Sequence, residues 1–89
     1  MRRERIEAAL AEALQPERIE VIDESAKHHG HAGARPGGET HYHVRMVAEG
    51  FAGQSRVARQ RMVNALLKAE FETGLHALSL DLKTPAEAG

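Results

Sequence analysis

The opening stretch "RRERIEAALAEALQP" carries apolar side chains at helical spacing. They are Ile6, Ala9, Leu10, Ala13 and Leu14. Apolar residues recurring every three or four positions are typical of a helix with one buried face. Pro16 then ends the run, because proline cannot continue a helix. We predict a helix over residues 2–14.

Two later stretches alternate between apolar and polar residues, which is typical of half-buried strands. The stretch "RIEVIDES" predicts a strand over residues 18–24, with Ile19 and Val21 on one face. The stretch "ETHYHVRMV" predicts a strand over residues 39–47. Its apolar face consists of Tyr42, Val44 and Met46, and its other face consists of His41, His43 and Arg45.

The second half of the chain returns to a helical pattern in "QSRVARQRMVNALLKAEF". Ser55 can cap the start of this helix, and Gly74 can close it. The pattern weakens over residues 58–61, which suggests a short helix that breaks into a longer one. A buried stripe is predicted from Val57, Met62, Val63, Leu66, Leu67 and Phe71.

A last strand is predicted in "LHALSLDL", with Leu78, Leu80 and Leu82 on the face of His76. The order helix, strand, strand, helix (split in two), strand predicts a small α+β fold. It consists of one three-stranded mixed sheet with helices on one face. Residues 1–85 form the single domain, and residues 86–89 form a flexible tail.

Between the first two strands lies a stretch rich in glycine, and five of the six histidines lie in or beside it in "KHHGHAGARPGGETHYHV". Glycine and proline exclude a helix or strand over residues 25–38. Structureless segments of this length inside compact domains are uncommon and often functional.

Composition narrows the possible functions. The 89 residues carry a net charge of −1, no cysteine, no tryptophan and only three aromatic side chains of the Phe and Tyr type. Such a balance lacks the surplus of cations and the stacking platforms of general nucleic-acid binders. The chain offers no thiolate ligand and no apolar run that could span a bilayer. We expect a cytoplasmic protein without a membrane partner, monomeric or weakly dimeric.

Catalytic motifs are missing from the sequence, whereas its histidines offer several metal-binding arrangements. No nucleophile elbow and no glycine-rich phosphate loop is present, so we predict a protein that is not an enzyme. His76 at a strand start is either a metal ligand or a partly buried histidine hydrogen-bonded to the backbone. His28 and His31, three residues apart in the loop, are either solvated or able to bind zinc by themselves. His41 and His43, about 6.6 Å apart along one strand face, can share a metal or point to solvent.

A basic helix offers a second functional reading. The predicted long helix carries Arg56, Arg59, Arg61 and Lys68. With the turn "AEGFAG" before it, this segment could form a helix-turn-helix element that contacts DNA. The alternative is a core helix whose basic face is solvated.

Several segments together resemble the BolA family: "IEVIDES", "GGETHYHV", "ARQRMVNALL", "GLHALSL" and the following "TP", in this order. The resemblance covers residues 3–85. It implies a BolA fold, similar to class II K-homology domains with the order α-β-β-α-α-β. Nucleic-acid binding does not follow from the resemblance in fold alone.

The resemblance also implies a partner and a cofactor. BolA proteins pair with monothiol glutaredoxins of the CGFS type and share a [2Fe–2S] cluster with them. In this resemblance, His76 of the "HAL" motif is a cluster ligand, and the loop supplies a second one. His28 best matches the loop position, with His31 and His29 as near substitutes. The glutaredoxin cysteine and glutathione would supply the sulfur ligands, and the isolated chain would hold no cofactor.

One departure from the family pattern concerns the basic helix. The family often shows "RHR" where this chain has Arg59, Gln60 and Arg61. Some family members regulate transcription, so DNA binding through the basic helix is the second hypothesis. The role in iron–sulfur trafficking, iron homeostasis or redox regulation is the first.

Overall fold

The structure is a computed structural model that describes residues 1–25 and 40–89. Its helices are α1 (Arg2–Leu14), α2 (Arg56–Leu66), α3 (Lys68–Glu72) and α4 (Pro85–Ala88), together with the 3-10 turn η2 (Glu49–Phe51). Its strands are β1 (Arg18–Asp23), β2 (His41–Val47) and β3 (Ala77–Lys83). The helix predicted over residues 2–14 is confirmed at both ends, and the predicted strands differ by one or two residues.

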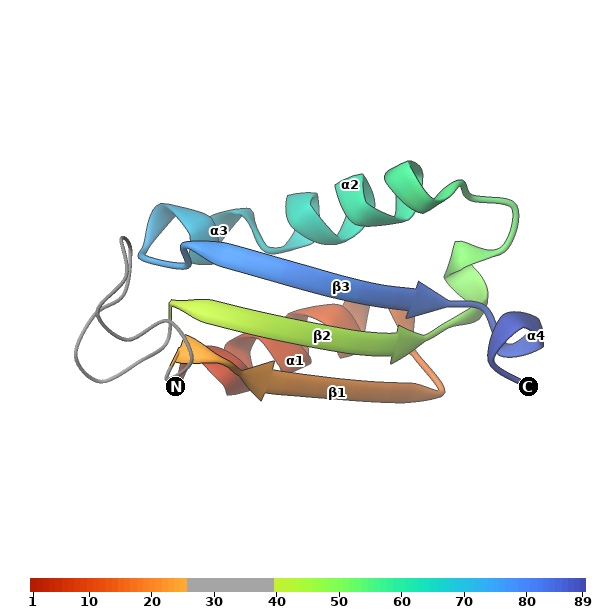
Figure 1. Ribbon diagram of the computed structural model, residues 1–89, viewed down its shortest axis with the longest axis horizontal. Helices are drawn as coiled ribbons and strands as arrows, with labels where there is room; N and C mark the ends of the chain where they lie inside the picture. Colours follow the sequence, from red (N-terminus) through yellow and green to blue (C-terminus); the bar gives the residue numbers. More distant parts are fainter. Residues whose placement is uncertain (26–39) are drawn as a thin grey trace.

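The three strands form one sheet in the order β1-β2-β3, and α1 and α2 cover the same face of it (Figure 1). Strands β1 and β2 pair antiparallel, whereas β2 and β3 pair parallel. A parallel pair needs a crossover connection, and α2 and α3 provide it. The α+β class, the mixed sheet and the helices on one face are therefore confirmed.

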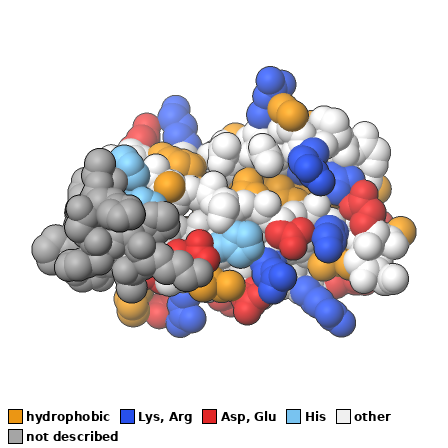
Figure 2. All heavy atoms as spheres, in the orientation of Figure 1, with side chains coloured by type: hydrophobic (Ala, Val, Ile, Leu, Met, Phe, Trp, Pro, Cys, Tyr) orange, Lys and Arg blue, Asp and Glu red, His pale blue; other side chains and the backbone are white. Residues whose placement is uncertain are grey.

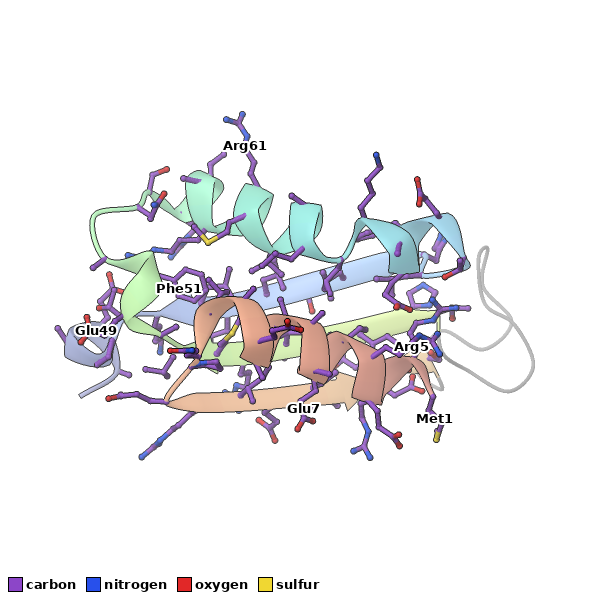
Figure 3. The ribbon with its side chains drawn as sticks, turned by 180° about the vertical axis from the view of Figure 1, so that it is seen from behind. Met1, Arg5, Glu7, Glu49, Phe51 and Arg61 are labelled. Carbon is purple, nitrogen blue, oxygen red and sulfur yellow. The ribbon has the colours of Figure 1, made fainter. Side chains whose placement is uncertain are left out.

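The core lies between this face of the sheet and the two long helices. Ile6 and Leu10 of α1 are fully buried, as are Val44 of β2 and Phe51 of η2. Figure 3 shows Phe51 between α1 and α2. The apolar face predicted for β2 is confirmed, because Tyr42 and Met46 are also buried. Aliphatic residues dominate this core, as the scarcity of aromatic residues requires.

The predicted helix break is present, but at another position. It falls at Leu67, which lies between α2 and α3 and caps both, not within residues 58–61. Ser55 caps α2 as predicted, since its hydroxyl accepts from the Ala58 N–H at 3.1 Å. Leu67 is buried at this break, whereas Phe71, which follows it in α3, is 38% exposed.

Three members of the predicted buried stripe are therefore wrong: Val57, Leu66 and Phe71 all lie at the surface. Val57 is 53% exposed in the first turn of α2. Val57 is six positions before Val63, so the two lie about 120° apart around a straight helix and cannot share one buried stripe. Of the three exposed residues, only Phe71 follows the break at Leu67.

The tail predicted to be flexible contains a helical turn. Thr84 caps α4, with its hydroxyl accepting from the Glu87 N–H and the Glu87 carboxylate accepting from the Thr84 N–H. The Arg59 guanidinium binds the same carboxylate at 2.7 and 3.1 Å. It also donates to the Leu82 carbonyl at 3.1 Å and lies over the Phe51 ring. These contacts attach α4 to α2 and β3.

We expect the Glu87 carboxyl to titrate far below its usual range. The Arg59 hydrogen bond, followed by that of the Thr84 backbone, lowers the pKa of Glu87 to about 2. A lowered pKa means that the contact stabilises the fold above the ordinary carboxyl pKa of about 4.3 and is lost as the pH falls through about 2. Carboxyl carbon NMR shifts measured against pH test this expectation.

The control for this titration is Arg59→Gln. In that variant the Glu87 midpoint should return toward about 4.3, because the guanidinium is gone. An unchanged midpoint in the variant would show that Arg59 is not the cause of the shift.

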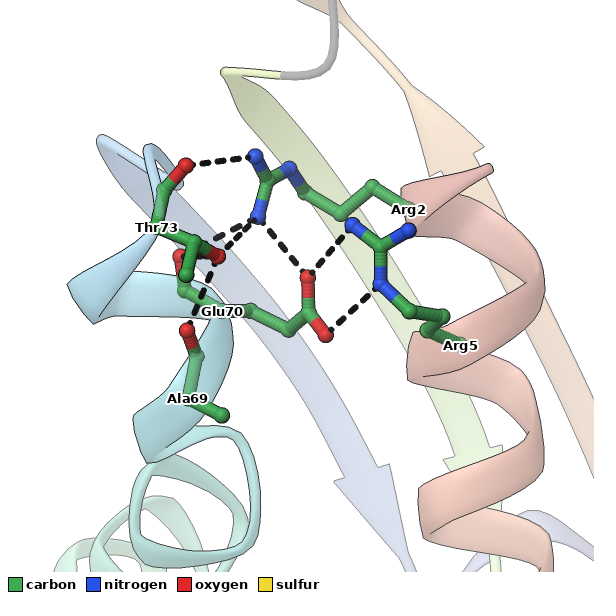
Figure 4. A network of polar contacts seen from close by, with 5 residues as sticks. All are labelled: Arg2, Arg5, Ala69, Glu70 and Thr73. Carbon is green, nitrogen blue, oxygen red and sulfur yellow. Dashed lines mark hydrogen bonds and ion pairs between the residues drawn. The ribbon is translucent and has the colours of Figure 1, made fainter.

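A second ionic network joins the start of α1 to α3 (Figure 4). Arg2 of α1 donates to the Glu70 carboxylate at 2.8 Å, to the Glu70 carbonyl at 3.1 Å and to the Thr73 carbonyl at 3.0 Å. Arg5 binds the same carboxylate at 3.1 and 3.2 Å. Arg2 and Glu70 are 8% and 9% exposed. The network holds the start of α1 against α3, next to the turn that leads into β3.

Candidate functional site

His76 occupies the turn between α3 and β3. Its N–H donates to the Thr40 carbonyl at 2.7 Å, and the Ala77 N–H donates to the same oxygen at 3.1 Å. The backbone of His76 is therefore fixed to Thr40, the residue just before β2. Its imidazole is exposed. The partly buried position considered for this residue is therefore wrong, because the structure leaves His76 exposed.

His41 lies directly beside His76. The centroids of the two rings are 5.3 Å apart and the ring planes are tilted by 52°. The parallel register explains the approach, because His41 pairs with Ala77, the residue after His76. Unlike His76, His41 is buried, with 6% of its surface exposed. Its Nδ1 lies 2.9 Å from the Thr40 hydroxyl.

This pair differs from the pairing considered from the sequence, in which His41 and His43 share one strand face. They do lie on the same face of β2, but they have separate partners. His43 Nδ1 lies 2.6 Å from the Ser79 hydroxyl of β3. Histidine side chains accordingly appear in two places on the face shown in Figure 2.

Ser25 joins the end of β1 to the start of β2 beside the histidine pair. Its hydroxyl oxygen accepts from the Thr40 N–H at 3.0 Å and from the His41 N–H at 3.1 Å. Ser25 and Thr40 are both buried. They are the last and first described residues on either side of the histidine-rich segment. The two ends of that segment are thus anchored next to His41 and His76.

The predicted loop ligands lie outside the described residues. These are His28, His29 and His31. Within residues 1–25 and 40–89, no group of three or more His, Cys, Asp or Glu side chains is placed to hold a metal ion. In these same ranges the site therefore consists of two imidazoles.

The basic residues of the second hypothesis do not form a uniform surface. Arg56, Arg61 and Lys68 are exposed, and Figure 3 shows Arg61 projecting away from the body of the protein. The side chain of Arg59 is only 12% exposed and is bound to Glu87. The element before the turn is strand β2, so the predicted helix-turn-helix arrangement is not formed around "AEGFAG".

The proximity of His41 to His76 is the feature that sequence reasoning missed. The alternating pattern assigned each residue to a strand but did not say which strand ends meet. The available signal was the connection between the last two strands, since a helical crossover of this length implies parallel pairing. Parallel strands begin at the same edge, which places the first residues of β2 and β3 together.

None of the described helices is long and apolar enough to cross a membrane.

Comparison with known proteins places this geometry in a family. The family model described as BolA-like protein matches residues 10–87. The protein BOLA1, chloroplastic, of Arabidopsis thaliana is 44% identical over 98% of this chain and 56% of its own length. The DNA-binding transcriptional regulator BolA of Escherichia coli is 41% identical over 98% of this chain and 79% of its own length.

A solved structure supports the same assignment. The BolA domain of SufE1 from Arabidopsis thaliana superposes with a TM-score of 0.88 and 45% identity, covering 97% of this chain and 94% of that domain. The chain spans only about half the length of the chloroplast relative named above.

Of the two relatives named above, the one from Escherichia coli is named as a transcriptional regulator, and neither bears the name of an enzyme. These names agree with the prediction of a protein that is not an enzyme. The sequence resemblance, the model match over most of the chain and the shared fold agree. The chain belongs to the BolA-like family.

Proposed function

We propose that this protein is a partner of a monothiol glutaredoxin and binds one side of a shared [2Fe–2S] cluster. Its role would lie in iron–sulfur trafficking, iron homeostasis or redox regulation. The observation that carries the proposal is the exposed imidazole of His76 beside the anchored ends of the histidine-rich segment. The cytoplasm stays the predicted location.

The described residues fit a cluster held between two proteins. A [2Fe–2S] cluster is usually bound by four thiolates, and histidine can replace two of them. This chain has no cysteine, so the sulfur ligands must come from elsewhere. His76 offers an exposed nitrogen donor on a backbone fixed by two hydrogen bonds to Thr40. Such rigidity is what a metal ligand requires.

The second ligand is proposed from the loop, with His28 first and His31 or His29 as substitutes. His28 is three residues from Ser25, and three residues of extended chain span at most about 11 Å. Ser25 is hydrogen-bonded to Thr40, whose carbonyl accepts from the His76 N–H. Covalent geometry therefore keeps His28 within reach of the region around His76.

The chemistry divides between the two partners. The cluster, when bound, would supply electron transfer or iron and sulfide for delivery. His76 and the loop histidine would hold it from this chain, while the glutaredoxin cysteine and glutathione supply thiolates. Imidazole ligation is expected to raise the reduction potential and to make binding sensitive to protonation.

The test is reconstitution of the cluster with a CGFS glutaredoxin and glutathione. Mixing with this protein should change the visible absorption and circular dichroism of the glutaredoxin cluster. His76→Ala should lower the affinity for the cluster-loaded glutaredoxin at least about tenfold, because one ligand and its geometry are lost. His76 is exposed, so the variant should fold normally.

The matched control is His43→Ala, which removes a histidine of β2. His43 is half-buried, and its Nδ1 lies 2.6 Å from the Ser79 hydroxyl. This variant should keep the spectrum and the affinity. An equal loss of affinity for the cluster-loaded glutaredoxin in both variants, or no loss of affinity in His76→Ala, would contradict the proposal.

A second candidate function is DNA binding by the exposed basic residues of α2 and α3. It is favoured by the relative named as a DNA-binding transcriptional regulator and by the exposure of Arg56, Arg61 and Lys68. Arg59 was included in this set from the sequence. Because its guanidinium is bound to Glu87, we expect it to contribute less than Arg61.

This second candidate predicts a salt-dependent interaction. Arg61→Ala should weaken DNA binding and reduce the slope of log affinity against log salt by about one unit. The double variant Arg59→Ala with Arg61→Ala should add little beyond that. No binding at low salt, or an Arg61→Ala variant that binds like the native protein, would argue against it.

A further inference from the structure

The outer edge of β3 is open along most of its length. Among the described residues, β3 pairs with β2 on one side and no strand pairs with it on the other. Backbone groups of Ala77 and Lys83 bond toward the β2 side. Because the direction of the backbone groups alternates along a strand, those of Leu78, Leu80 and Leu82 point outward.

One position of this edge is already occupied. The Arg59 guanidinium donates to the outward carbonyl of Leu82 at 3.1 Å. No side chain in the described part of the chain bonds to the backbone of Leu78 or Leu80. A row of unpaired N–H and carbonyl groups is a template for another strand. The open part of the edge is therefore centred on Leu80.

A groove of about 600 Å³ lies beside this edge, between β3, the start of α2 and α4. Leu80 and Leu82 line it, and both are half-buried, so their side chains can still lose exposed surface. Figure 2 shows hydrophobic side chains at the surface between β3 and α2. An extended segment along β3 can therefore pair with its backbone and bury apolar side chains in the groove.

The charges of the groove favour an anion at one end. Its two carboxylates, Asp81 and Glu87, are each bound by an arginine. Arg56 and Lys83 also line the groove. Neither of these cations forms an ion pair with another described residue. A segment that reaches the end of β3 should therefore carry a negative charge there.

We propose that the open edge of β3 binds an extended peptide segment of another protein, with acidic residues at its amino end and apolar residues at alternate positions. The segment would run antiparallel to β3, since antiparallel pairing is the more stable kind. This direction places its amino end beside Arg56 and Lys83. A second copy of this chain does not fit the charge pattern, because an antiparallel β3 pair centred on Leu80 places Lys83 opposite Ala77.

This docking edge is separate from the proposed cluster site. His76 lies just before β3, whereas Lys83 ends it. Seven residues of strand span about 20 Å. Peptide binding at the edge does not depend on a shared cluster, so either function can fail without the other.

The experiment uses the full chain without glutaredoxin and, as its probe, a short capped peptide in which two glutamates precede alternating valine and threonine. Amide hydrogen exchange is followed by NMR. With saturating peptide, the N–H groups of Leu78 and Leu80 should exchange at least about tenfold more slowly. The N–H groups of Ser79 and Asp81, which face β2, are the internal control and should not change.

Two control peptides test the two parts of the recognition. A peptide with lysines in place of the glutamates should bind at least about tenfold more weakly, because like charges then meet. A peptide methylated at the backbone nitrogens that face β3 should not bind, because it cannot form the ladder.

Two matched variants test the cationic end of the groove. Arg56→Glu should weaken binding of the acidic peptide at least about tenfold, since it places a carboxylate against the glutamates. Arg61→Glu makes the same charge change on a side chain that projects away from the body of the protein (Figure 3). It should bind within about threefold of the native chain.

Four results would overturn the proposal. The first is unchanged exchange of the Leu78 and Leu80 amides with excess peptide, and the second is an equal loss of affinity in Arg56→Glu and Arg61→Glu. The third is protection of these amides that grows with protein concentration alone, which would indicate a second copy. The fourth is their protection by a single-stranded oligonucleotide but not by the peptide, which would assign the groove to nucleic acid.

Discussion

Glu70→Ala is expected to lower the free energy of unfolding by about 3 kcal/mol, since it removes the shared partner of two arginines. The Glu70 carboxylate accepts from Arg2 at 2.8 Å and from Arg5 at 3.1 Å. Arg2 is as buried as Glu70, so the variant leaves a guanidinium without its carboxylate in a largely dry position. Urea unfolding of both proteins measures the difference.

Glu72→Ala is the matched control for this change. Glu72 is an exposed carboxylate on the same short helix α3. Its replacement should alter the free energy of unfolding by no more than about 0.5 kcal/mol. A Glu70→Ala variant as stable as Glu72→Ala would show that the network does not hold α1 against α3.

The same network predicts how the difference in free energy of unfolding between the native protein and Glu70→Ala depends on pH. The Arg5 hydrogen bond lowers the pKa of Glu70, with Arg2 adding to the effect and burial opposing it. A lowered carboxyl pKa stabilises the fold above the unfolded value of about 4.3, and this contribution is lost as the pH falls through the folded value. The difference in free energy of unfolding between the native protein and Glu70→Ala should therefore become smaller below about pH 4.

Ser25→Ala is expected to cost about 2 kcal/mol, because two buried backbone N–H groups lose their acceptor. These are the N–H groups of Thr40 and His41. The variant should also release the start of β2, so hydrogen exchange of both amides should accelerate together. The His76 amide should also exchange faster, because it donates to the Thr40 carbonyl.

Ser79→Ala serves as the comparison for that variant. Ser79 is an exposed serine of β3 whose hydroxyl contacts His43. Its removal should change stability by less than about 0.5 kcal/mol. If Ser25→Ala left both amides as protected as in Ser79→Ala, Ser25 would not be the residue that anchors the strand ends.

The parts of the fold that depend on neighbouring residues could be predicted from the sequence. The helix over residues 2–14 is an example, because a regular apolar spacing and Pro16 define it locally. The apolar face of β2 is another, since alternation alone assigns Tyr42, Val44 and Met46 to the core. The same patterns predicted the order of helices and strands, and the family resemblance agrees with that order.

The parts that depend on distant residues could not be predicted. The helix breaks at Leu67, between α2 and α3, and the apolar spacing along the chain does not indicate this position. The helical turn of the tail is capped locally by Thr84 and Glu87, but its attachment to α2 depends on Arg59, 28 positions from Glu87. The approach of His41 to His76 likewise follows from strand register, which no local pattern specifies.

The measurement that tests the central claim most directly is electron–nuclear spectroscopy of the reduced cluster shared with a CGFS glutaredoxin. This chain would be labelled with ¹⁵N at its histidines and the glutaredoxin left unlabelled. We predict a nitrogen coupling from directly bound imidazole that disappears in His76→Ala and persists in His43→Ala. A reduced cluster without ¹⁵N coupling, or with the full coupling retained in His76→Ala, would contradict the account.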